Sequence, residues 1–185
     1  MILALDCATK TGWCLWDNGK IIESGVQDFA KQRGESNGAM FLRFRHWLKS
    51  MIIGFGFKGI VAPSDLERLR YGDGLVVKVS NDEELVPFPM NKISFVIYEQ
   101  AHHRGGAATE ISVNLTGRVQ EICAELGIEF ASVHTGTLKK FATGRGNTDK
   151  SEVMAKAREI LGREPLDDNE ADAVMLAKYA SENYG

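Results

Sequence analysis

The sequence predicts an α/β fold in which a mixed five-stranded sheet carries helices on both faces. Short apolar runs at 2–5 and 95–98 have the length of buried strands. The Asn18-Gly19 pair between two strand patterns predicts a tight hairpin, because both residue types accept positive φ angles. After residue 93, strand and helix patterns alternate, which is typical of parallel strands joined by helices. The sheet is therefore expected to begin antiparallel and to continue parallel.

The first third of the chain predicts three strands and one helix. The antiparallel strands are expected at residues 1–6, 13–16 and 21–29. A helix is predicted over 40–53, where apolar side chains recur at helical spacing. This order gives an N-terminal meander followed by a helix that covers it.

The remainder predicts two further strands and four helices around an insertion. Residues 62–91 are interpreted as an irregular insertion, which could include a hairpin with a strand at 75–79. The later strands are predicted at 93–98 and 128–133, and the later helices at 107–126, 137–141, 149–161 and 168–182. Asp167 with Glu170 three residues later resembles a capping box at the last helix. We expect residues 1–185 to form one domain.

Composition predicts a soluble globular protein of the cytoplasm. Hydrophobic residues make up 44% of the chain and charged residues 25%, which are ordinary values for such a domain. The apolar runs are too short to span a bilayer, and Asp6 interrupts the first run too early for a signal peptide. Three cysteines without a secretion signal predict reduced thiols. We therefore expect no membrane partner.

The charge balance limits how this chain would bind nucleic acid. A net charge of −3 argues mildly against a general nucleic-acid coat, which is usually basic. It is compatible with a DNA enzyme whose acidic site contributes negative charge and whose basic residues are local. Such a basic patch is predicted within residues 139–158, from Lys139, Lys140, Arg145, Lys150, Lys156 and Arg158.

Four carboxylates form the candidate catalytic centre. Asp6 and Glu99 end two apolar strands, and Asp168 and Asp172 lie four residues apart at the start of a helix. Mg²⁺ prefers oxygen ligands, and two such ions can hold a scissile phosphate and activate water. Each residue alone has a plainer interpretation as a turn, a buried ion pair or a helix cap. The joint pattern predicts a metal-dependent nuclease.

The same residues resemble a known family. Residues 2–6 with Thr11-Gly12-Trp13 are similar to the first motif of the RuvC-type Holliday junction resolvases, which have the RNase H-like fold. Residues 96–100 resemble the second motif, residues 144–153 the Gly-x-Gly loop that leads to Lys-Ser, and residues 168–173 the final acidic motif. The motifs follow the family order. The chain is more similar to a bacteriophage or divergent bacterial member than to a housekeeping one.

The resemblance implies a homodimer that cuts four-way DNA junctions by paired nicks. It makes Asp6, Glu99 and Asp172 ligands of Mg²⁺, with two ions per site and Mn²⁺ as a substitute. At the fourth position the family places an acid or a histidine where this chain has Asn169, so Asp168 and Asn169 are both candidates and Asp168 is favoured. It also implies a bacterial cytoplasm or a phage-infected cell. The insertion at 62–91 has no counterpart in the family that we can place.

Several residues are expected to contact DNA. Lys150 matches a basic residue near the family's site and is also a candidate catalytic residue, which would stabilise charge on the cleaved phosphate. Lys139 stands eleven residues earlier, at the spacing of another family lysine. Arg145 is expected to position the DNA backbone. The loop after Glu99 contributes His102, His103 and Arg104, of which His102 is placed to stack on a base. Zinc binding by the two histidines is disfavoured, because adjacent side chains on an extended segment point apart.

The helix at 107–126 carries small residues that suggest packing against a second copy. These are Ala107, Ala108, Ser112 and Gly117, beside Ile111, Leu115 and Ile122. Packing of this helix on its own sheet is nearly as well supported by the pattern.

Three different functions compete with a junction resolvase. The segment at 6–12 loosely resembles the phosphate loop of sugar kinases and actin, but that class needs two such domains and this chain is too short. The second is a non-catalytic junction-binding protein. The third is a broader branched-DNA or flap nuclease, because one fold can support several substrate preferences.

Overall fold

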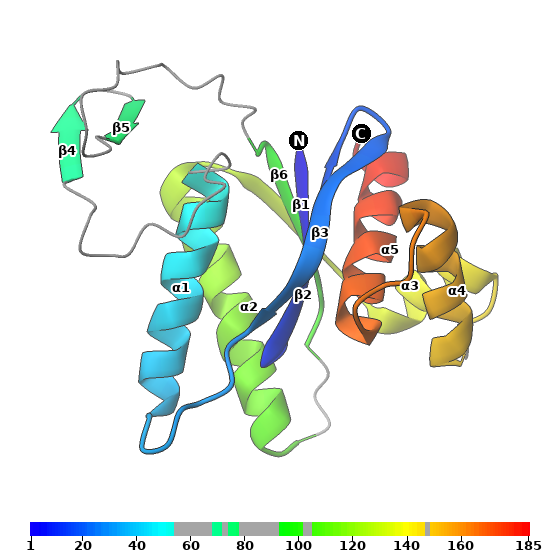
Figure 1. Ribbon diagram of the computed structural model, residues 1–185, viewed down its shortest axis with the longest axis horizontal. Coiled ribbons are helices and arrows are strands. Elements are labelled where there is room, and N and C mark those ends of the chain that lie inside the picture. Colours follow the sequence, from blue (N-terminus) through cyan, green and yellow to red (C-terminus); the bar gives the residue numbers. More distant parts are fainter. Residues whose placement is uncertain (54–67, 72–73, 78–92, 102–104, 147–148) are drawn as a thin grey trace.

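The computed structural model describes residues 1–53, 68–71, 74–77, 93–101, 105–146 and 149–185. One five-stranded sheet with helices on both faces forms the body of the protein, as the sequence predicts (Figure 1). Among the described residues, no helix combines the length and the apolar composition that crossing a membrane requires.

The sheet joins an antiparallel half to a parallel half. Its strands are β1 (Ile2–Asp6), β2 (Lys10–Asp17), β3 (Lys20–Asp28), β6 (Phe95–Glu99) and β7 (Glu129–Val133). They lie in the order β3-β2-β1-β6-β7, with β1 antiparallel to β2 and β2 antiparallel to β3. β6 runs parallel to β1, and β7 runs parallel to β6. The predicted mixed sheet is confirmed.

The hairpin between β2 and β3 also forms as predicted. Asn18 has φ 47° and Gly19 has φ 81°, the two positive angles that a type I′ turn requires. β2 begins at Lys10 rather than at residue 13, because Thr11 and Gly12 pair with β3. The connection between β1 and β2 is therefore shorter than the predicted strand bounds imply.

Two groups of helices cover the two faces of the sheet. α1 (Asn37–Ile53) and α2 (Ala107–Leu126) lie on one face, and α3 (Thr135–Thr143), α4 (Lys150–Leu161) and α5 (Asp168–Asn183) lie on the other (Figure 1). α1 begins three residues earlier than predicted. α3 extends two residues beyond each end of the predicted helix.

Residues 62–91 are described only in part. β4 (Arg68–Tyr71) and β5 (Gly74–Val77) pair as antiparallel strands, in agreement with a hairpin inside the insertion. The strand predicted at 75–79 thus begins one residue earlier. The rest of the insertion lies outside the described residues, so the extent of the single domain stays a prediction.

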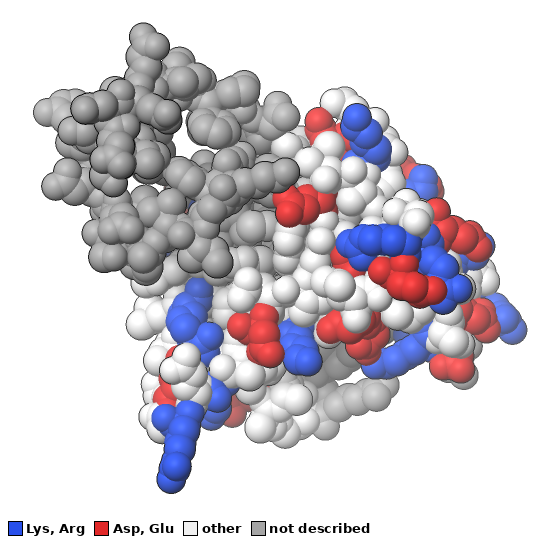
Figure 2. Space-filling model, in the orientation of Figure 1, with Lys and Arg blue, Asp and Glu red and all other residues white. Residues whose placement is uncertain are grey.

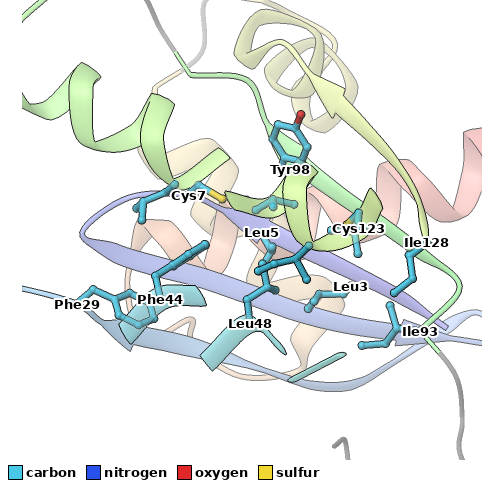
Figure 3. Packing of buried hydrophobic residues seen from close by; sticks show 14 of the residues in the cluster. Leu3, Leu5, Cys7, Phe29, Phe44, Leu48, Ile93, Tyr98, Cys123 and Ile128 are labelled. Atoms are coloured by element: carbon cyan, nitrogen blue, oxygen red, sulfur yellow. The ribbon is translucent and has the colours of Figure 1, made fainter. Parts of the chain in front are cut away.

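Alternating strand residues build a separate core on each face. Leu3 and Leu5 point toward α1 and α2, where they pack with fully buried Phe44 and Leu48 (Figure 3). Ala4, between them, packs on the opposite face with the apolar side of α5. Each fully buried large side chain contributes about 1.5–3 kcal/mol of transfer free energy. The strand ends are thereby held rigidly between two helical layers.

Candidate active site

Asp6 and Glu99 lie at the same edge of the sheet because their strands are parallel neighbours. Leu5 of β1 is in register with Tyr98 of β6, and each carboxylate follows on the next position of its strand. Both residues are partly buried. The negative charge of Glu99 raises the pKa of Asp6, so the two carboxylates interact. The structure thus brings together two acids that are 93 positions apart in the sequence.

The start of α5 supplies the other two acids. Asp6 pairs with Gly12 across β1 and β2, and α5 packs on these two strands. A Cβ atom at position 12 would lie 1.8 Å from the carbonyl oxygen of Asn169. Only a residue without a side chain permits this approach. Gly12 therefore allows Asp168 and Asp172 to come near Asp6.

A buried carboxylate fixes the start of α5 against β3. Glu170 is fully buried, and its oxygens accept hydrogen bonds from Arg163 Nη2 at 2.6 Å, Ser24 Oγ at 2.6 Å and the Leu166 N–H at 2.6 Å. Burial alone would raise the pKa of Glu170, but these donors outweigh it and lower the pKa. Asp167 caps the helix by accepting from the Glu170 N–H at 3.1 Å. The predicted capping box is thus half formed, because the Glu170 side chain bonds elsewhere.

The four acids share one electrostatic environment. The pKa of Asp6 is raised well above its ordinary range by burial first, and then by the charges of Glu99, Asp172 and Asp168. Burial, Glu99 and Asp168 raise the pKa of Asp172 to about 7, against the opposing charges of Lys150 and Lys139. Carboxylates held this closely against their mutual repulsion form a site that favours a bound cation.

Polar neighbours already contact two of these acids. Lys150, the first residue of α4, forms an ion pair with Asp168, which lowers the pKa of Asp168 and raises that of Lys150. Thr135, the first residue of α3, donates its hydroxyl hydrogen bond to Glu99. Lys150 is among the site residues predicted from the sequence, whereas Thr135 is not, because nothing in the local pattern distinguishes this threonine.

The two candidates for the fourth position differ in their surroundings. The negative charge of Asp168 raises the pKa of both Asp6 and Asp172. The side-chain amide of Asn169 instead donates to Asp167 at 3.1 Å. These contacts support Asp168 over Asn169 as the fourth member of the site, which stays a prediction.

The donor chemistry of this cluster fits Mg²⁺, since all four side chains offer carboxylate oxygens. In the part of the chain that the structure describes, no three His, Cys, Asp or Glu side chains stand in an arrangement that would hold an ion as they are. Glu99 is bonded to Thr135 and Asp168 to Lys150 in this arrangement.

The predicted basic patch is largely neutralised by neighbouring acids. Within residues 139–158 the ion pairs are Arg145–Glu152 at 3.3 Å, Lys156–Glu159 at 2.8 Å and Arg158–Glu164 at 2.6 Å. Figure 2 shows basic and acidic side chains interspersed on the face that it draws. Lys139 and Lys150 differ from these residues, because their positive charges act on Asp172 and oppose the rise in its pKa. His102, His103 and Arg104 lie outside the described residues.

The expected dimer helix packs partly on its own sheet. Leu115 and Ile122 are fully buried in the core, Ile111 packs against it, and Ser112 Oγ donates to the Cys7 carbonyl at 2.9 Å. A Cβ atom on Gly117 would meet no described atom within 4 Å. The surface of α2 that is left for contact with a second copy is thus smaller than the sequence pattern suggested.

Known proteins resemble this chain in fold rather than in sequence. No protein family model and no curated protein sequence matches the chain. Among solved structures, RuvC from Thermus thermophilus superposes with a TM-score of 0.64 at 15% identity, covering 98% of this chain and 95% of that one. The chain has the fold of RuvC.

Two complexes show the same likeness. RuvC from T. thermophilus with a Holliday junction substrate gives a TM-score of 0.66 at 15% identity, with 97% of this chain and 92% of that chain covered. The Fowlpox virus resolvase with Holliday junction DNA gives 0.53 at 10% identity, with 98% and 99% covered. Both comparisons cover nearly the whole chain.

Proposed function

We propose that this protein is a metal-dependent endonuclease that resolves four-way DNA junctions by paired nicks. The observation that carries the proposal is the meeting of four carboxylates from β1, β6 and α5 at one sheet edge. Their interaction is seen in the raised pKa of Asp6, to which Glu99, Asp172 and Asp168 all contribute. The likeness in fold to RuvC and to a poxvirus resolvase, both solved with Holliday junction DNA, supports this choice of substrate.

Each acid has a defined part in the proposed site. Asp6, Glu99, Asp168 and Asp172 would hold one or two Mg²⁺ ions, for which Mn²⁺ would substitute. Bound divalent ions would orient the scissile phosphate and lower the pKa of the attacking water. The chain itself supplies rigid placement, because two acids sit on strands held between cores and two sit on a helix clamped by Glu170.

Lys150 and Lys139 provide positive charge next to the acids. The Lys150 side chain is 75% exposed and pairs with Asp168, which leaves its ammonium group within reach of a phosphate at the site. Such a group stabilises the negative charge that develops on the cleaved phosphate. Lys139 lies on α3 and would position the DNA by contacting its backbone. Backbone contacts carry no sequence information by themselves.

A homodimer is part of the proposal, since paired nicks need two sites related by symmetry. The outward side of α2 is the contact surface that we propose, since Val113 is 39% exposed there and a Cβ atom on Gly117 would meet none of the described atoms within 4 Å.

Cleavage of a synthetic four-way junction tests the proposal. The junction, a matched duplex and a flap are incubated with the protein with and without Mg²⁺, and the Asp172→Asn variant serves as the control. Symmetric nicking of the junction that needs Mg²⁺ and is lost in Asp172→Asn supports a resolvase. Equal cutting of the flap identifies a broader debranching nuclease. Binding of the junction without cutting by the wild type contradicts an enzyme and favours a junction-binding protein.

A further inference from the structure

The sheet register places the start of α3 next to Glu99. Val133 of β7 is in register with Glu99 of β6, and α3 begins two residues later at Thr135. His134 caps this helix, because its Nδ1 accepts from the Gly136 N–H at 3.1 Å. The cap fixes the direction in which the first turn of α3 leaves the sheet. Thr135 consequently lies on the same sheet edge as the candidate metal ligands.

The hydroxyl of Thr135 makes a directed contact with Glu99. Its Oγ1 donates to Glu99 Oε1, and both residues are partly buried. A glutamate has three rotatable side-chain bonds, and fixing them in one conformation costs conformational entropy. A donor on a helix that is capped and packed in the core lowers this cost before any ion arrives.

A second residue on the same helix face acts on another acid. Lys139 is four residues after Thr135, which places the two side chains on one side of α3. The charge of Lys139 opposes the rise in the pKa of Asp172. Leu138 and Ala142, three and seven residues after Thr135, lie on the same side of α3 and are buried in the core, so this side of the helix faces the sheet.

We propose that Thr135 is a positioning residue that orients Glu99 for metal binding. This inference rests on the proposed function, because it assigns to Thr135 the task of holding one of the proposed ligands. Hydrogen-bond partners that orient metal ligands typically contribute about 10–100-fold to metal affinity or activity.

Substitutions at position 135 test the role of the hydroxyl. Thr135→Val keeps the shape and removes the donor, whereas Thr135→Ser keeps the donor and removes a methyl group. We expect Thr135→Val to weaken Mn²⁺ binding, measured by calorimetry without DNA, by about 10–100-fold. We expect Thr135→Ser to restore affinity to within a few-fold of the wild type. The affinity of the metal-free protein for a four-way junction should not change.

Thr116→Val is the matched control. Thr116 is buried on α2, and its hydroxyl donates to the Val113 carbonyl of the same helix at 3.0 Å rather than to an acid. This variant should bind Mn²⁺ like the wild type. Equal weakening by both threonine-to-valine exchanges would overturn the proposal, as would unchanged Mn²⁺ affinity in Thr135→Val.

A double-mutant cycle with Glu99→Gln keeps the test valid if Thr135→Val also lowers the thermal unfolding midpoint. When Thr135 acts through Glu99, the valine exchange causes no further loss of Mn²⁺ affinity in the Glu99→Gln background. Additive losses would overturn the proposal while leaving the nuclease function intact. A wild type that neither binds Mn²⁺ nor cuts the junction would overturn both.

Discussion

A Cβ atom at Gly12 would lie 1.8 Å from the carbonyl oxygen of Asn169. The same Gly12 is the β2 partner of Asp6, and Asn169 lies between the two acids of α5. The contact between strand and helix therefore sets the separation between the acid of β1 and the acids of α5. It makes the geometry of the site depend on a residue that has no functional group.

Gly12→Ala should displace the start of α5 and abolish cleavage. The added methyl group meets backbone atoms, which cannot rotate away, and overpacking of this kind costs about 1–3 kcal/mol. We expect a lower thermal unfolding midpoint together with loss of junction cutting and of Mn²⁺ binding. Gly38→Ala on α1 is the control, because its Cβ would meet only Ser36 Oγ at 3.7 Å. Full activity in Gly12→Ala would show that α5 does not need this approach.

Glu170→Gln should destabilise the protein although Glu170 is not a proposed ligand. The exchange weakens a charged hydrogen bond to Arg163 and leaves the Leu166 N–H or Ser24 with a poorer acceptor, at a cost of about 2 kcal/mol. Urea unfolding measures this difference. Glu159→Gln is the matched control, because its surface pair with Lys156 contributes less than about 1 kcal/mol. Equal losses of unfolding free energy in the two variants would contradict the role of Glu170 in fixing the start of α5.

The metal-free protein should lose stability as the pH rises. The folded protein raises the pKa of Asp172 to about 7 and raises that of Asp6 as well. A raised pKa means that the folded state binds protons more tightly than the unfolded chain. The stabilising contribution is therefore complete below about pH 4, the ordinary range of an aspartate, and is lost as the pH rises through about 7.

Thermal unfolding in a chelator, from about pH 5 to about pH 8.5, measures this effect. The midpoint of the wild type should fall over this range relative to that of Asp172→Asn, which cannot ionise at this position. Mg²⁺ should raise the wild-type midpoint most at the alkaline end, because ligands must be deprotonated. If the unfolding midpoints of the two proteins changed with pH in parallel, this would contradict the repulsion assigned between Asp172 and the neighbouring acids.

Gly117→Arg should produce a folded monomer. A side chain at this position enters open space in one copy of the chain, and arginine favours helix over glycine by roughly 0.8–1 kcal/mol. If the outward side of α2 joins two copies, the bulky charged group prevents their contact. Light scattering should show a change from twice the chain mass of 20.4 kDa to that mass, with the circular-dichroism spectrum of the folded protein retained. Gly38→Arg on α1 should remain dimeric, and an unaffected mass in Gly117→Arg would exclude this contact surface.

The parts of the fold that sequence reasoning predicted have local signals. Asn18 and Gly19 specify a turn by their own backbone preferences, and Gly127 ends α2 with φ 64° where the pattern stops. Asp6 and Glu99 were predicted to belong to one site because each follows a short apolar strand. Each of these inferences needs only a few neighbouring residues.

The contacts that complete the site have no such signal. Ser24 reaches Glu170 across 146 positions, and Thr135 reaches Glu99 across 36. The start of α3 was predicted two residues late, because histidine is not among the residues that usually cap helices. The predicted basic patch was too simple, since a count of lysines and arginines does not show which acids pair with them.

The hydrogen bond between Ser24 and Glu170 also bears on how the molecule folds. Contacts between such distant positions close large loops, and loop closure slows folding. The carboxylates of α5 gather beside Asp6 only after the first hairpin and the last helix have met. A nascent or partly unfolded chain consequently holds its acids apart and lacks an assembled centre. The four acids can therefore share one site only in the folded chain.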